Sequence, residues 1–185
     1  MANSDAAFGL RPVRHLTGGE IRTNEYAIAA SSSAMYTGSL TIATAAGGCT
    51  IAATDSTDVL GVFMGCFYTD PTTSKPTWSK SWPNNAADDA VAFICDDPDV
   101  VFEIQTDGTV TDAAINANAD SAGVSGSTTT GVSTTELSSS ITGSGTAQLR
   151  IIGRSKDPDN TDTGNANSNW YVIINEHAYR QTTGT

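Results

Sequence analysis

The sequence predicts an all-β protein, namely a single β-sandwich, jelly-roll or small β-barrel domain with an extended N-terminal arm and long polar loops. Three observations predict this fold. Only 38% of the 185 residues are hydrophobic, and a strand that buries one face needs an apolar side chain only at every second position. Thr and Gly recur along the whole chain, which makes helix costly. Short apolar stretches alternate with segments rich in turn-forming residues.

Eight stretches carry strand patterns. The run 59–68 is apolar at both odd and even positions, which predicts a strand covered on both faces. Gly61 and Gly65 within it indicate a bulge or a close approach of another backbone. The expected strands are 26–30, 40–42, 49–53, 59–68, 90–95, 100–105, 147–152 and 170–175.

The stretch 100–105 alternates cleanly between apolar and polar residues. Val100, Phe102 and Ile104 are expected to point into the core. Glu103 and Gln105 are expected to point outward.

Two long segments have fewer strand signals. Residues 116–146 consist mostly of Ser, Thr, Gly and Ala and cannot supply a core alone, although 128–141 suits an edge strand or an ordered loop. The loop 69–87 holds three prolines with Trp78 and Trp82. Because exposed tryptophan is costly, this loop either folds back onto the domain or makes an interface.

The chain divides into an arm, residues 1–20, a β-rich domain, residues 21–180, and a tail, residues 181–185. The arm has neither helical nor strand periodicity and mixes basic with apolar side chains. Such a terminus suits docking onto a partner, and the alternative is that it packs on its own domain. The candidate interface residues are Phe8, Leu10, Arg11, Pro12, Val13, Arg14 and His15, together with Trp78 and Trp82.

Composition limits the partners. The formal net charge is −11 at pH 7, so nucleic acid, whose binding needs clustered Lys and Arg, is not expected. No stretch approaches the roughly 20 apolar residues of a membrane span, and no secretory signal precedes the domain. Cys49, Cys66 and Cys95 lie in apolar stretches without paired spacing, so we expect reduced, buried thiols.

No motif for catalysis or cofactor binding stands out. The chain lacks G-x-S-x-G, H-E-x-x-H and a phosphate loop, and no zinc-ligand spacing surrounds His15 or His177. Only His177 is placed to be a catalytic histidine, and surface or interface contacts are the expectation for both. The acidic turn 96–99 is expected to cap strands or to be solvated. We therefore expect no catalytic residues, no cofactor and no enzymatic activity.

Calcium is the one metal weighed. Asp157, Asp159, Asn160 and Asp162 offer oxygen ligands. Their spacing departs from that of an EF-hand loop, and Gly164 falls too late in it. The expectation is therefore no metal site, with a weak calcium site at these residues left open.

Several segments taken together carry a resemblance. They are 8–15 (FGLRPVRH) followed by Gly18-Gly19, 96–99 (DDPD) leading into 102–105 (FEIQ), 148–151 (QLRI), 157–160 (DPDN) and 174–177 (INEH). This combination resembles virion structural proteins of tailed phages, of the decoration or cement kind. The resemblance spans both ends and the middle of the chain but carries little in 116–146.

The resemblance implies a small β protein that binds the outside of an icosahedral capsid and ties neighbouring capsomers together. The expected partners are the major capsid protein and further copies of the chain, in a symmetric dimer or trimer. The expected location is the outer capsid surface of the virion, after synthesis in the host cytoplasm. These features follow from the resemblance.

Two other functions stay open. The first is a host-recognition domain of a tail fibre or spike, in which Trp78, Trp82 and Trp170 would stack on a glycan. Fibre domains usually show repeats or a shaft, and neither is visible in the sequence. The second is a hydrolase that uses acidic residues, which ranks last.

Overall fold

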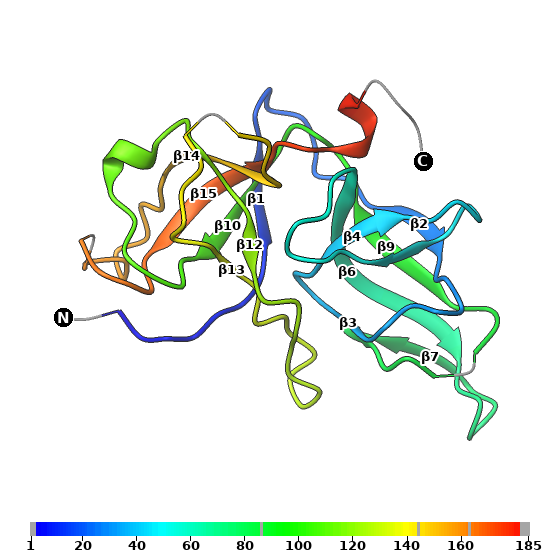
Figure 1. Ribbon diagram of the computed structural model, residues 1–185. Helices are drawn as coiled ribbons and strands as arrows, with labels where there is room; N and C mark the ends of the chain where they lie inside the picture. The colour runs from blue at the N-terminus through cyan, green and yellow to red at the C-terminus, as the bar shows by residue number, and fades with distance from the viewer. Residues whose placement is uncertain (1–2, 86, 144, 163, 182–185) are drawn as a thin grey trace.

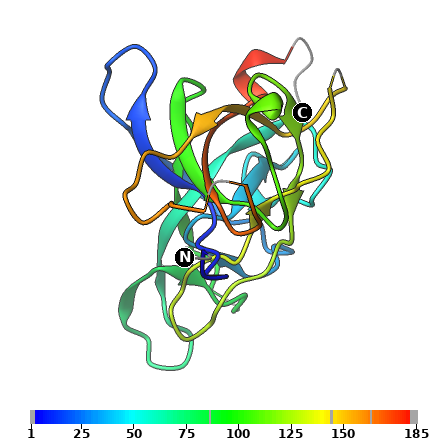
Figure 2. The same ribbon diagram turned by 90° about the vertical axis from the view of Figure 1, so that its left-hand side faces the viewer.

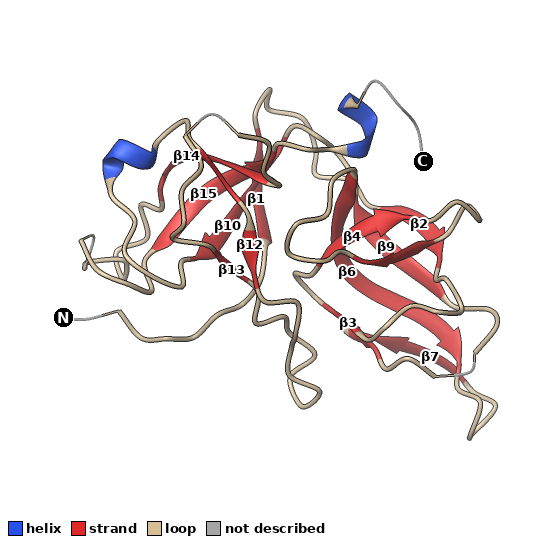
Figure 3. Cartoon of the chain, viewed as in Figure 1, coloured by secondary structure: helices blue, strands red, loops and turns tan. Residues whose placement is uncertain are grey.

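The computed structural model describes residues 3–85, 87–143, 145–162 and 164–181. As the composition predicts, these residues form an almost entirely β fold (Figure 3). Within them the only helices are two single-turn 3₁₀ helices, η1 (Asp112–Ala114) and η2 (Ala178–Arg180). Among the described residues, no helix has the length and apolar character needed to span a bilayer.

Two antiparallel sheets make up most of the fold, sheet A on the left and sheet B on the right of Figure 1. Sheet A contains, in spatial order, β1 (Arg11–His15), β10 (Val100–Gln105), β15 (Asn169–Ile174), β14 (Leu149–Arg154) and β11 (Asn118–Ala119). Sheet B contains β2 (Asn24–Ala27), β9 (Val91–Cys95), β6 (Val59–Thr69), β4 (Leu40–Ala43) and β5 (Cys49–Ile51), and β7 (Pro76–Ser79) also pairs with β6.

Two short pairs complete the strands: β3 (Met35–Tyr36) with β8 (Ser81–Trp82), and β12 (Ser121–Ala122) with β13 (Glu136–Leu137). The last pair lies in the segment of low complexity, where an edge strand or an ordered loop was expected over 128–141. Strand β13 pairs with β12 and also forms an isolated bridge from Leu137 to Thr106, next to the end of β10. Leu137 and Ala119 of this polar segment are fully buried in the main core cluster, and Ile141 packs against it.

The main core lies between the two sheets. Val59 and Val62 of β6 pack in one cluster with Phe102 of β10 and Trp170 of β15. Figure 2, turned by 90°, shows sheet A in front of sheet B. The chain crosses from sheet B to sheet A at residues 96–99, between β9 and β10.

Strand β6 is buried on both faces, as predicted from its apolar run. Its other face, with Leu60 and Phe63, belongs to a second cluster that also holds Met35 and Trp82 of the β3–β8 pair. Most of this second cluster comes from the strands of sheet B themselves, and a bridge between Ile28 and Cys49 brings the two outer ends of the sheet together around it.

Both glycines of β6 have the expected roles. A Cβ at Gly61 would lie 2.3 Å from the carbonyl oxygen of Cys95, closer than real Cβ atoms come, so β6 and β9 need a glycine here. Gly65 has a φ of +147° and follows a shift in the β6–β9 register after Phe63. The shift is the predicted bulge.

The N-terminal segment differs from the expected arm. Residues 11–15 form the edge strand β1 on β10, and Leu10, expected to dock on a partner, is 1% exposed in the inter-sheet core. The backbone N–H of Leu10 donates to the carbonyl of Gly38 at 2.9 Å. The register shifts between Pro12 and Arg14. This irregularity breaks the alternation, which is why the sequence pattern did not indicate a strand.

The residues before β1 cover the outer face of β10. The side chain of Gln105 accepts from the N–H of Ala6 at 2.9 Å and donates to the carbonyl of Ser4 at 3.1 Å. Glu103 and Gln105 face away from the core as predicted, but they are only 4% and 5% exposed. The expected tail, 181–185, lies outside the described residues except for Gln181.

Removing the Leu10 side chain tests whether the N-terminal segment is part of the folded core. Leu10→Ala should lower the free energy of unfolding by about 2–5 kcal/mol, because it leaves a cavity between the sheets. Val13→Ala, at a side chain that is 38% exposed, is the control and should cost less than about 1 kcal/mol. Urea denaturation measures both. Equal, small losses would show that the segment is not packed on the domain.

The three thiols are free and buried, as predicted. Burial raises the pKa of Cys49 and Cys66 to about 12 and that of Cys95 to about 11. Since the thiolate is the reactive form, labelling at pH 8 should be slow in the native protein and complete in denaturant. Rapid native labelling of all three, or disulfide-linked peptides in a digest, would contradict this expectation.

Candidate functional site

The most exposed pair of large aromatic side chains lies on the β6–β7 hairpin. Phe67 and Trp78 stand opposite each other in the strand register and are 43% and 57% exposed. A Cβ at Gly65 would lie 3.0 Å from Cζ2 of Trp78, so the missing side chain lets the indole approach the backbone of β6. Cross-strand aromatic pairs stabilise a hairpin, and an exposed pair of this size also offers a contact surface.

Two contacts hold the hairpin in place. At its tip, the Asp70 carboxylate accepts from the backbone N–H groups of Thr72 and Thr73 at 2.7 and 3.1 Å. Next to Phe67, the ring of Tyr68 meets the buried ring of Trp82 edge to face, with centroids 5.4 Å apart. The hairpin extends from sheet B at the lower right of Figure 1. It therefore presents Phe67 and Trp78 on a fixed support.

The two tryptophans of this segment have different positions. Trp82, included in the predicted interface, is 3% exposed and packs in the second core cluster. Trp78 is the one that stays at the surface. The loop thus folds back onto the domain through one tryptophan and exposes the other.

The predicted interface residues of the N-terminal segment are also divided. Val13 and Arg14 are exposed, and Leu10 is buried. Arg11 is exposed but forms an ion pair with Glu103 and lies 4.7 Å from the centre of the half-buried Phe8 ring. Pro12 is half-buried. These residues belong to sheet A and Trp78 to sheet B, so the structure does not join them into one continuous strand surface.

A dense polar cluster surrounds the turn 96–99. The Asp96 carboxylate is fully buried and accepts from Asn24 Nδ2 at 2.9 Å and Tyr26 Oη at 2.6 Å. Tyr179 Oη donates to it at 3.0 Å, and Arg22 Nε lies 3.6 Å away. Burial alone would raise the pKa of Asp96, but these donors outweigh it and the pKa is lowered. Asp96 was expected to cap strands or to be solvated, and it is instead a buried anion.

One group in the described residues brings three metal-ligating side chains together: His15, Asp97 and Asp99. His15 Nδ1 accepts from the backbone N–H of Thr17 at 3.2 Å, which places the proton of a neutral ring on Nε2. His15 Nε2 lies 3.3 Å from Asp97 Oδ2, and Arg180 pairs with Asp99. The Nδ1 lone pair of His15 and the carboxylate of Asp99 are therefore already engaged, and this group is a network of hydrogen bonds and one ion pair that joins β1 to the turn 96–99.

His177 is buried, in contrast to the expected surface position. Its side chain is 0% exposed and caps η2, with Nδ1 accepting from the N–H of Tyr179 at 3.2 Å. Nε2 has no partner among the described residues. Burial, together with the Arg180 charge, lowers the pKa of His177 to about 4. A substrate cannot reach this ring in the folded structure.

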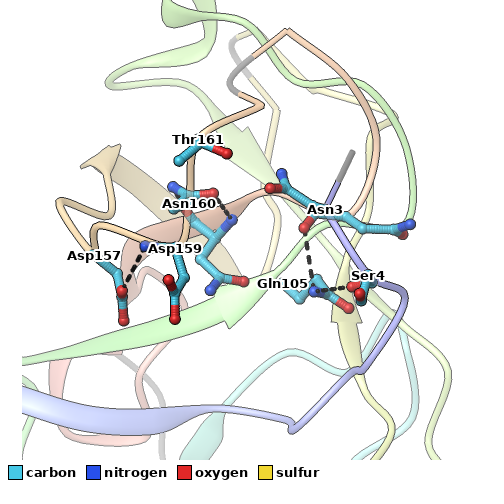
Figure 4. A pocket seen from close by; sticks show the side chains of 9 residues that line it. Asn3, Ser4, Gln105, Asp157, Asp159, Asn160 and Thr161 are labelled. Carbon is cyan, nitrogen blue, oxygen red and sulfur yellow. Dashed lines mark hydrogen bonds between the residues drawn. The ribbon is translucent and has the colours of Figure 1, made fainter. Parts of the chain in front are cut away.

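Figure 4 shows a polar pocket of about 530 Å³ that is lined in part by the acidic loop weighed as a calcium site, including Asp157 and Asp159. Asn160 fastens the loop: its Nδ2 donates to the carbonyls of Ser155 and Asn169, each at 3.0 Å. The Asp157 carboxylate accepts from the N–H of Asp159 at 3.0 Å, and Asp162 accepts from Asn165 at 2.6 Å, outside the pocket lining. Within the described residues, Asp157, Asp159 and Asp162 are not grouped as close metal ligands, and the contacts observed for these side chains are hydrogen bonds within the loop.

Comparison with protein-family models, curated proteins and solved structures finds no match to this chain. Function is therefore argued from the surface features of the molecule. The sequence indicated Trp78 but not its partner Phe67. The polar, turn-forming residues 70–75 between apolar 59–68 and Pro76 were the signal for a hairpin that pairs the two.

The buried neutral His177 predicts a specific pH dependence of stability. In the unfolded chain its pKa returns to about 6.5, so the unfolded state takes up a proton between pH 6.5 and 4 that the folded state does not. The free energy of unfolding should therefore fall as the pH is lowered through this window, by about 2–3 kcal/mol for this group.

The variant His177→Asn isolates this contribution. Asparagine keeps the acceptor at the N-terminus of η2 but does not titrate. Urea denaturation between pH 7 and 4.5 should show a steeper loss of stability for the wild type than for the variant. Parallel pH profiles of the two proteins would contradict the assignment.

Proposed function

We propose that the protein is a non-enzymatic virion structural protein, which binds the outside of a tailed-phage icosahedral capsid and cements neighbouring capsomers of the major capsid protein. The observation that carries this proposal is the exposed pair Phe67 and Trp78 on a hairpin that is held by the Asp70 turn and by the contact of Tyr68 with Trp82. Exposed aromatic anchors on a rigid support are typical of binding hot spots, because little conformational entropy is lost on docking.

Two further features support this function. The resemblance of segments such as 8–15 and 96–99 to decoration and cement proteins agrees with a small, all-β architecture. A symmetric dimer or trimer would repeat the hairpin around a symmetry axis of the shell. Repetition converts a modest contact area per copy into stable attachment.

Glycan recognition by a tail-fibre or spike domain is the second candidate. It is favoured by the exposed face of Trp78, since indole rings stack on sugars. The other two tryptophans assigned to stacking, Trp82 and Trp170, are 3% and 0% exposed. A single exposed tryptophan beside Phe67 suits a protein contact better than an aromatic platform.

Binding to emptied capsids tests the first candidate. Trp78→Ala should weaken co-sedimentation with capsids by about tenfold or more, as expected for a hot-spot tryptophan. Ile115→Ala is the matched control, since Ile115 is an exposed apolar residue (38%) next to η1, at the opposite side of the molecule in Figure 1. This variant should bind like the wild type.

The copy number per virion, measured by quantitative mass spectrometry, separates the two candidates. Hundreds of copies per particle support a shell protein, and a handful support a tail component. Unchanged capsid binding by Trp78→Ala would refute the role of the hairpin.

A further inference from the structure

A second surface differs in charge from the rest of the protein. A groove of about 820 Å³ crosses the face of sheet A that is turned away from sheet B. It is lined by Val13, Arg14, Asp112, Ile152, Gly153, Arg154, Ser155, Lys156 and Tyr171. Three of these residues are cationic and one is anionic, so the lining carries a formal charge of +2 in a chain whose net charge is −11. Local positive charge on an acidic protein marks a place for an anionic partner.

The cations of the groove are available to a ligand to different degrees. Arg14 and Lys156 are exposed and form no ion pair within the described residues. Arg154 is held in position: it pairs with Asp112 at 2.9 Å, and its guanidinium lies 5.0 Å from the centre of the Trp170 ring. Its Nε is buried without a partner in the described part of the chain. The groove thus has two free cations and one cation that is held in place.

The floor of the groove is apolar. Val13 is 38% exposed, because it lies on an edge strand whose residues are mostly exposed. Ile152 and Tyr171 are half-buried in the same lining. A ligand that fills the groove would cover these three side chains and gain hydrophobic free energy in addition to charge pairing. A bare phosphate or a nucleic-acid backbone would use the cations but not this floor.

We propose that this groove is a docking site for an acidic peptide segment of a partner protein, in which carboxylates flank an apolar side chain. The carboxylates pair with Arg14 and Lys156, beside the fixed Arg154, and the apolar side chain covers Val13 and Tyr171. Arginine matches the planar geometry of a carboxylate particularly well. This inference does not depend on capsid binding by the hairpin, because the groove and the hairpin belong to different sheets.

The test uses a fluorescein-labelled peptide, blocked at both ends, in which four glutamates surround one leucine. Fluorescence anisotropy of the full chain should show saturable binding that weakens as ionic strength rises. Arg14→Glu and Lys156→Glu should each weaken binding by about tenfold, since each replaces an attraction by a repulsion. A peptide with serine in place of the leucine should also bind more weakly.

The matched control is Lys75→Glu. Lys75 is an exposed lysine at the tip of the β6–β7 hairpin, and its replacement changes the net charge by the same amount outside the groove. This variant should bind the peptide like the wild type. Equal weakening by Lys75→Glu would mean that only net charge matters and would overturn the proposal, as would absence of binding by the wild type.

Two other outcomes would reassign the groove. Tighter binding of a sulfated oligosaccharide than of the peptide, lost in Arg14→Glu, would overturn the proposal in favour of an anionic glycan. Self-association in sedimentation experiments that Arg14→Glu abolishes would assign the groove to a second copy of this chain. Each groove variant should retain the wild-type thermal unfolding midpoint, because both side chains are exposed.

Discussion

The buried carboxylate of Asp96 is the constraint on which the arrangement of the two sheets depends. A buried anion without partners would be strongly destabilising, by roughly 3–5 kcal/mol for a pair broken on one side. Its partners are Asn24 and Tyr26 of β2 and Tyr179 of η2. Asp96 lies where the chain passes from sheet B to sheet A. The hydrogen bonds to its carboxylate therefore hold β2 and η2 against the connection between the two sheets.

Two more links join the sheets away from Asp96. The buried side chain of Gln148 donates to the carbonyl of Ala53 at 2.8 Å and accepts from the hydroxyl of Ser121 at 2.7 Å. The N–H of Val59 donates to the carbonyl of Glu176 at 2.8 Å, so the segment after β15 reaches the start of β6. These links use backbone and neutral amide groups, which need no charge compensation. The polar groups between the sheets therefore hold the two sheets together, whereas the hairpin and the groove lie at the surface.

Much of the fold followed from local patterns in the sequence. The eight expected strands correspond to β2, β4, β5, β6, β9, β10, β14 and β15, because each contains a run of apolar or alternating residues. The burial of β6 on both faces followed from apolar side chains at both parities. Free, buried cysteines followed from their positions within such runs.

What could not be predicted depends on contacts between distant residues. The polar composition of 96–99 is the same whether Asp96 is solvated or buried. Its burial depends on distant donors such as Tyr26 and Tyr179, which are 70 and 83 residues away. His177 looked like a surface residue for the same reason. In the candidate site, Trp78 and Trp82 were equivalent in sequence, and the pairing of β8 with β3 put only the second one inside.

The irregular edge of sheet A has a consequence for the behaviour of the protein at high concentration. Strand β1 lies at the end of sheet A, so one side of its backbone has no neighbouring strand among the residues that the structure describes. Pro12 contributes no N–H group there, and the register shift next to it distorts the spacing of the remaining donors and acceptors. An incoming strand from another molecule would find no regular template for edge-to-edge polymerisation. The register shift beside Pro12, which kept the sequence pattern from indicating β1, thus also protects the protein from amyloid-like aggregation through this edge.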